Sequence, residues 1–105
     1  MAWIYLILAG VCEIGWPIGL KLGWTPVGPR PLWIGFAIGC MAISGALLLM
    51  AQRTIPMGTA YAVWTGIGAV GTFIVGIAMF GDAVSAGRLV AVGLIVAGVV
   101  GLKFA

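Results

Sequence analysis

Residues 54–81 read TIPMGTAYAVWTGIGAVGTFIVGIAMFG and contain no charged side chain. A second uncharged run extends from Pro31 to Gln52. A helix of about 20 apolar residues suffices to cross the hydrocarbon core of a bilayer, so either run is long enough to span it. These two runs therefore predict membrane-spanning helices, and they decide the class of fold.

The composition of the whole chain agrees with a membrane protein. Of 105 residues, 64% are hydrophobic and 7% are charged, and the mean hydropathy is +1.29. Soluble domains have roughly 45–50% apolar and about 25% charged residues. This excludes a soluble domain and a disordered chain. The net charge of +3 is spread along the sequence, so no nucleic-acid partner is expected.

Breaker residues divide the chain into four predicted spans within a single transmembrane domain, residues 1–105. Three prolines and two glycines between residues 23 and 31 predict a loop, while Pro56 and the Gly81-Asp82 step mark the other turns. The spans lack the polar alternation of a transmembrane barrel. We therefore expect an all-α membrane protein with helices at about 3–22, 32–51, 57–80 and 86–103.

The first span is expected to remain in the protein rather than to be cleaved as a signal. It has no basic segment before it, and it carries Glu13 in its middle. Trp3, Trp24 and Trp33 fall at predicted span ends, where tryptophan rings anchor helices in the headgroup zone.

The flanking charges give only a weak orientation signal. Arg53 and Lys103 lie on the side of the N-terminus, and Lys21, Arg30 and Arg88 lie on the other side. Two cations against three is a small bias for the positive-inside rule. Such a chain can insert either way round, which makes an antiparallel dimer available.

The last span contains small residues at four-residue spacing. Gly93, Ala97 and Gly101 follow this spacing, with Gly98 beside them. Small residues let helix backbones approach closely in lipid. The stripe is interpreted as a candidate dimer-packing face, with packing inside one chain as the alternative.

Cysteine and histidine usage argues against metal sites and catalysis. The chain has no histidine, and Cys12 and Cys40 stand alone without a Cys-x-x-Cys motif. A zinc site, a disulfide framework and a Ser-His-Asp triad are therefore not expected. Glu13 has no second carboxylate in its span for acid–base work, so neither an enzyme nor a metal cofactor is predicted.

Glu13 is the most informative residue of the sequence. It lies ten positions past Trp3, which places it roughly 15 Å deep, near the middle of the bilayer. Lys21 is about two turns away at the interface, so no basic partner is apparent inside the membrane. Removal from water penalises the charged carboxylate, so we expect it to take up a proton or attract a cation. Competition between the two for one carboxylate is the minimal requirement of an antiporter.

Aromatic residues are spaced to accompany this acid. Trp16 follows Glu13 by one turn, and Tyr61 and Trp64 repeat the same spacing on the third span. Their rings attract cations, and beside a buried acid the set favours a cation pocket over the alternative that the rings simply fill apolar space. Ser44 lies mid-span on the second helix, where it either orients Glu13 or bonds to its own backbone.

The effect of the proline and glycine residues near the acid has two possible interpretations in each case. Pro17 cannot donate to the Glu13 carbonyl, which creates either a bend with a free acceptor or a harmless kink. Gly66 and Gly68 begin a G-x-G-x-x-G pattern, but no strand precedes it, so a nucleotide site is rejected. We expect these glycines to bend the helix, with packing as the alternative.

The segment PMGTAYAVWTGIG at residues 56–68, together with Glu13, resembles the small multidrug resistance family of transporters over essentially the full chain. The pattern Gly10-x-x-Glu13-x-x-Trp16 and the closing Gly101-Leu-Lys103 are similar to its guanidinium-exporter subtype. Pro17 and the proline-rich segment from residue 26 to 31 depart from that pattern.

The resemblance implies a proton-coupled exporter that works as an antiparallel dimer with one deep site between protomers. It implies that Glu13 is the shared proton and cation site, that Trp16, Ser44 and Tyr61 orient it, and that Trp64 lines the pocket. It implies that Gly10 leaves room beside the acid. The driving force would be the proton gradient, without a cofactor.

The sequence thus predicts a homodimer in the inner membrane of a prokaryote that exchanges protons for guanidinium or small substituted guanidinium ions. Three alternatives stay open at this stage. The first is a broader exporter of quaternary ammonium compounds, and the second is one subunit of a heterodimeric exporter. The third is a membrane scaffold without transport.

Overall fold

The computed structural model describes all residues, 1–105, and contains four long helices. They are α1 (Ala2–Gly23), α2 (Pro31–Ala51), α3 (Met57–Phe80) and α4 (Ala86–Phe104). Each is long and apolar enough to cross a membrane. The expected all-α class with four transmembrane helices is therefore confirmed.

Local sequence signals set the helix boundaries. Pro31 occupies the first turn of α2, where its missing N–H costs nothing. Helix α3 ends at Phe80 and is capped by Gly81, whose φ of 68° lies in the left-handed region that favours glycine. At the start of α4, the Ser85 hydroxyl accepts a hydrogen bond of 3.2 Å from the Arg88 backbone N–H, which caps the helix.

The connection between α1 and α2, which was predicted as a loop, folds as a short hairpin. Strands β1 (Trp24–Thr25) and β2 (Gly28–Pro29) pair antiparallel. The Thr25 hydroxyl donates to the Gly28 carbonyl at 2.9 Å, and the φ of 122° at Gly28 suits only glycine. The hairpin ties the end of α1 to the start of α2.

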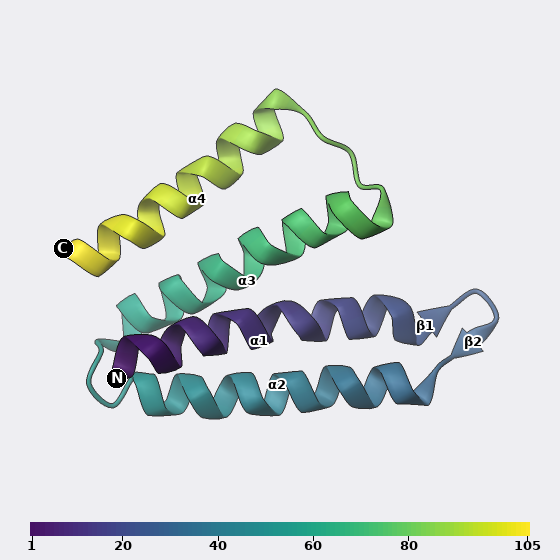
Figure 1. Ribbon diagram of the computed structural model, residues 1–105, viewed down its shortest axis with the longest axis horizontal. Helices are drawn as coiled ribbons and strands as arrows, with labels where there is room; N and C mark the ends of the chain where they lie inside the picture. Colours follow the sequence, from purple (N-terminus) through teal and green to yellow (C-terminus); the bar gives the residue numbers. More distant parts are fainter.

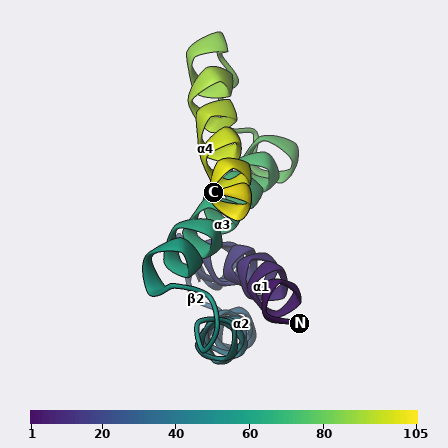
Figure 2. The same cartoon turned by 90° about the vertical axis from the view of Figure 1, so that its left-hand side faces the viewer.

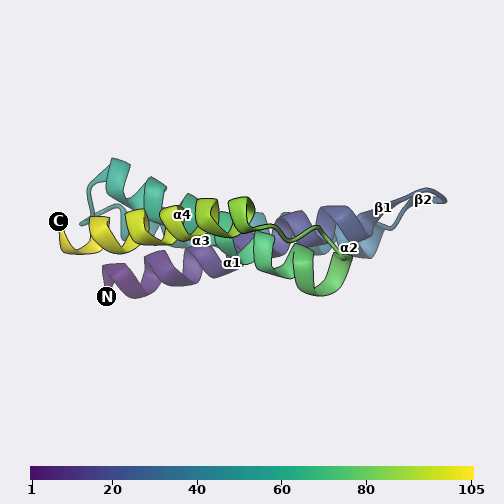
Figure 3. The same ribbon diagram turned by 90° about the horizontal axis from the view of Figure 1, so that it is seen from above.

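The helices lie in a row rather than in a closed bundle. Helix α1 packs between α2 and α3, and α4 lies on the far side of α3 (Figure 1). Figure 2 shows the same order along the row, and Figure 3 shows the narrow dimension. The protein measures 47 × 35 × 16 Å, and helices with their side chains are about 10–12 Å across. The chain is thus a thin slab.

Most of the apolar surface of this slab is uncovered. Only 14 of 105 residues are buried, and α4 buries none. An apolar surface of this extent is not stable in water, so lipid or another protein chain must cover it.

Small residues bring α1 and α2 close together and thereby position the site. A Cβ atom at Gly19 would lie 2.9 Å from the Trp33 carbonyl oxygen, and one at Gly15 would lie 2.6 Å from the Cys40 sulfur. Larger residues at these positions would separate the two helices. The close approach allows Ser44 of α2, which is fully buried, to reach the acid of α1.

Candidate functional site

The site is an open groove of about 510 Å³ with Glu13 on one wall. Its lining comes from the middle of α1 and from one face of α3. The sequence analysis missed Thr65, Ala69 and Thr72, although helical spacing from Tyr61 places all three on that face. The lining residues are Glu13, Trp16, Pro17, Tyr61, Trp64, Thr65, Gly68, Ala69 and Thr72.

Two helices hold the carboxylate of Glu13. The indole N–H of Trp16, one turn later on α1, donates to Oε1. The Ser44 hydroxyl, from α2, lies 3.1 Å from Oε2. The structure therefore brings together three of the residues that the sequence analysis selected, and it resolves the open alternative for Ser44 in favour of contact with the acid.

The Ser44 hydroxyl is the centre of a wider network. It lies 2.7 Å from the Ala9 carbonyl oxygen, and the Trp64 indole N–H donates to it at 2.8 Å. A hydroxyl has one proton to donate and two lone pairs. Its proton can go to the Ala9 carbonyl or to Oε2 of Glu13, but not to both at once.

This arrangement can satisfy Glu13 in both protonation states. An ionised Glu13 accepts the proton of Ser44. A protonated Glu13 can instead donate to Ser44 Oγ, whose own proton then goes to the Ala9 carbonyl. Trp64 donates to Ser44 in either case, and no buried polar side-chain atom lacks a partner. The network thus tolerates proton exchange without leaving a buried group unsatisfied.

Tyr61 lies differently from its expected position. Its side chain is 57% exposed, and its hydroxyl makes no hydrogen bond to Glu13. The ring centroid is 5.4 Å from that of Trp64, in a tilted arrangement. In this structure Tyr61 is therefore part of the aromatic wall of the groove and makes no contact that would orient the acid.

The selected glycines mark close contacts between helices. A Cβ atom at Gly68 would lie 2.7 Å from Cγ of Glu13, and one at Gly66 would collide with Val99. A Cβ atom at Gly10 would lie 2.7 Å from the Ile67 side chain, so this glycine makes room for α3 rather than for a ligand beside the acid. Helix α3 runs unbroken through its glycines, and α1 runs unbroken through Pro17.

No other part of the structure offers comparable chemistry near the middle of the helices. An apolar cavity of about 270 Å³ between α1, α3 and α4 is lined by aliphatic residues and glycine only. No group of His, Cys, Asp and Glu side chains could hold a metal ion. Both cysteines are free.

Comparison with known proteins agrees with this geometry. Residues 1–95 match the family described as Small Multidrug Resistance protein. The chain belongs to the small multidrug resistance family.

Relatives of this chain carry the name guanidinium exporter. The one from Citrobacter freundii is 51% identical over 105 residues, which cover 98% of this chain and 96% of the relative. Those from Salmonella typhi and Yersinia pseudotuberculosis are 50% and 49% identical, with similar coverage. As a member of the small multidrug resistance family, the chain is a multi-pass transporter of the inner membrane and not an enzyme, as predicted.

Proposed function

We propose that this chain exports guanidinium or small substituted guanidinium ions in exchange for protons, with both competing for Glu13. The observation that carries the proposal is the carboxylate itself. It is partly buried in a mid-helix groove, both of its oxygens have hydrogen-bonding partners, and no basic side chain lines the groove. The names of the relatives support guanidinium as the substrate.

Guanidinium matches the chemistry of the groove. It is a planar cation with paired N–H groups, and such groups bind carboxylates in a bidentate geometry that is among the strongest hydrogen-bonded pairs. The rings of Trp16, Tyr61 and Trp64 line the same groove and can attract a cation through their faces. The proton gradient supplies the driving force, so no cofactor is required.

Proton coupling follows from the two protonation states of Glu13. Ionised Glu13 binds the cation, and protonation removes the charge that holds it. The Ser44 network supports this cycle because it can bond to either form. The cation and the proton then occupy the same carboxylate in turn, so uptake of one requires release of the other.

We also propose that two protomers form an antiparallel homodimer with a single site between them. The thin protomer leaves the groove open, and a dimer partner would supply the missing wall. Alternating access would arise when the two protomers exchange conformations around the fixed site. A heterodimer with a related chain remains the alternative.

The uncovered face of α4 supports pairing between protomers. Its small residues are exposed, and a Cβ atom at any of its three stripe glycines would meet nothing within 4 Å. Close helix pairing requires a free face of this kind. The proposed dimer-packing residues are Gly93, Ala97, Gly98 and Gly101.

The size of the groove favours a second candidate substrate class. At about 510 Å³, it is larger than guanidinium alone requires. Quaternary ammonium ions cannot donate hydrogen bonds and would rely on the aromatic wall. Broader export of such cations is therefore the alternative function.

Proton flux in liposomes that contain only this chain tests the proposal. A guanidinium gradient directed out of the vesicles is expected to drive protons into the vesicle lumen. Tetraethylammonium in a parallel sample is expected to drive little proton uptake. Equal flux with both cations would favour the broader exporter. Absence of flux with either would refute the self-sufficient homodimer.

Ser44→Ala is expected to slow guanidinium-driven proton flux by about 10-fold or more, because the buried Trp64 N–H and Glu13 both lose a hydrogen-bond partner. Initial rates measured with a pH-sensitive dye inside the liposomes give the effect. Cys40→Ala, one turn earlier on α2 and outside the network, is the matched control. Equal rates for the two variants would contradict a role for the network.

A further inference from the structure

The two acidic residues of the chain line adjoining cavities. Glu13 lines the groove described above, and Asp82, the other acid, lines a second cavity of about 230 Å³. Both cavities include Pro17 and Thr72. The second cavity lies where α1 and α3 end, so the shared lining connects the middle of the helices with one membrane face.

The turn after α3 holds the Asp82 carboxylate over this cavity. The left-handed conformation of Gly81 reverses the chain, and the Asp82 backbone N–H donates to the Gly76 carbonyl at 3.0 Å. The side chain thereby folds back onto α3, where a Cβ atom at Gly76 would collide with its carboxylate oxygen. Two glycines thus fix the position of a carboxylate that would otherwise move with the loop.

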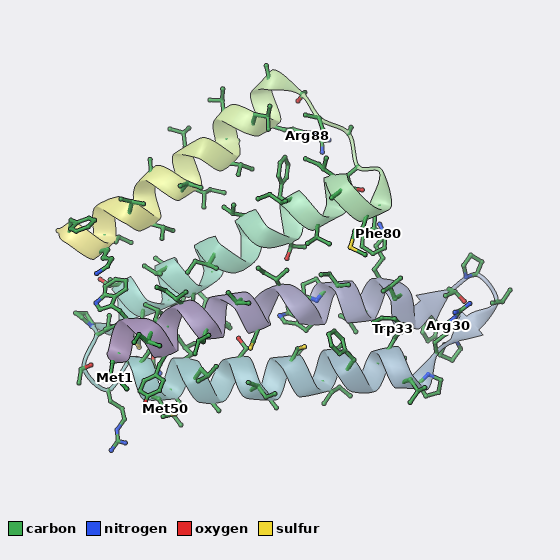
Figure 4. All side chains as sticks on the ribbon, in the orientation of Figure 1. Met1, Arg30, Trp33, Met50, Phe80 and Arg88 are labelled. Carbon is green, nitrogen blue, oxygen red and sulfur yellow. The ribbon has the colours of Figure 1, made fainter.

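The cavity mouth also contains an aromatic ring that already holds a cation. The Lys21 ammonium lies over the ring of Phe80, 5.0 Å from its centroid, rather than in a salt bridge with Asp82. Figure 4 shows Phe80 between the end of α3 and α1. The mouth therefore combines a carboxylate without a cationic partner and a ring that accepts cations, which are the two features that bind guanidinium.

We propose that Asp82 is a second cation-binding residue, which holds guanidinium briefly between the Glu13 groove and the membrane face. This inference rests on the function proposed above and adds a step to it. Lys21 competes for the same mouth, which keeps the occupancy short. In the antiparallel dimer, each membrane face carries one such mouth, so Asp82 acts in both entry and exit.

Asp82→Asn tests the proposal because it removes the charge and keeps the shape. A unit charge about 4 Å from a cation in water changes the local cation concentration about fivefold. We expect kcat/KM for guanidinium-driven proton flux to fall about fivefold. The equilibrium affinity of the Glu13 groove, measured by quenching of its tryptophan fluorescence, is expected to stay unchanged.

The dependence on salt separates attraction from a structural effect. Between about 10 mM and about 100 mM salt, the Debye length falls from about 30 Å to about 10 Å. Native kcat/KM should fall over this range, and Asp82→Asn should show a flatter dependence. Asp82→Glu, which keeps the charge, should restore most of the native rate and its salt dependence.

Gly76→Ala gives an independent variant that keeps the acid and displaces its carboxylate. Gly76→Ala should lower kcat/KM as Asp82→Asn does. A variant that carries both substitutions should be no slower than either single variant. Gly87→Ala, near the same membrane face but in open space, is the matched control.

Two results would overturn the Asp82 proposal. One is an Asp82→Asn variant with native kcat/KM at low salt, and the other is a parallel loss of affinity at the Glu13 groove. Both differ from failure of the proposed function, in which the native chain itself would show no guanidinium-driven flux.

Discussion

Replacing Glu13 by glutamine is expected to reduce guanidinium-driven proton flux to the level of protein-free liposomes. No other acid lies within a helix, so no group remains that can carry the proton or pair with the cation in the groove. Glutamine has nearly the same shape, and its carbonyl can still accept from Trp16. The variant should therefore fold, and circular dichroism should show native helix content.

The same variant tests competition between proton and cation. In the native chain, guanidinium binding should weaken as the pH falls, because protonation removes the negative charge that attracts it. In Glu13→Gln, any residual binding should not depend on pH. Fluorescence of Trp16 and Trp64 reports binding in both proteins. Residual coupled flux in the variant would show that protons travel by a route that bypasses this carboxylate.

Replacing Gly68 by alanine is expected to lower the flux by about 100-fold, although the change adds one methyl group. That Cβ atom would lie 2.7 Å from Cγ and 3.2 Å from Cβ of Glu13, so the acid or the whole of α3 must shift. A misplacement of about 1 Å at a functional group can cost about 100-fold in rate. Initial flux rates at saturating guanidinium measure the effect.

Gly45→Ala is the matched control for this change. Gly45 lies in α2, and a Cβ atom there would meet nothing within 4 Å. The control should transport as the native chain does, and both variants should reconstitute equally. Flux within twofold of native for Gly68→Ala would mean that α1 and α3 separate easily at this point.

The four helices were predictable because long uncharged runs leave few other possibilities for a chain in a membrane. The pairing of Glu13 with Trp16 was also predictable, since residues three apart share a helix face. Contacts between helices were harder to foresee. Whether Ser44 reaches the acid depends on how closely α1 approaches α2, and small residues such as Gly19 set that distance.

Other features depend on local backbone geometry that a pattern of residue types does not specify. The hairpin after α1 needs the hydrogen bond from Thr25 to Gly28, so its breaker residues alone suggested only a loop. Tyr61 has the right spacing to Trp64, but spacing along α3 does not say whether its hydroxyl reaches Glu13, and in the structure the two side chains share the groove without a hydrogen bond. Asp82 marked a turn in the sequence, and only the conformation of Gly81 places its carboxylate over a cavity.

The 16 Å thickness of the protomer has a genetic consequence for the proposed homodimer. One gene encodes both walls of the pathway, so every point mutation is inherited by both walls at the same time. No unmutated copy remains to compensate. Each codon specifies the same residue in both protomers, so selection acts on both positions of that residue together. Assigning an effect to one wall therefore requires a tandem fusion of two copies in which only one carries the substitution.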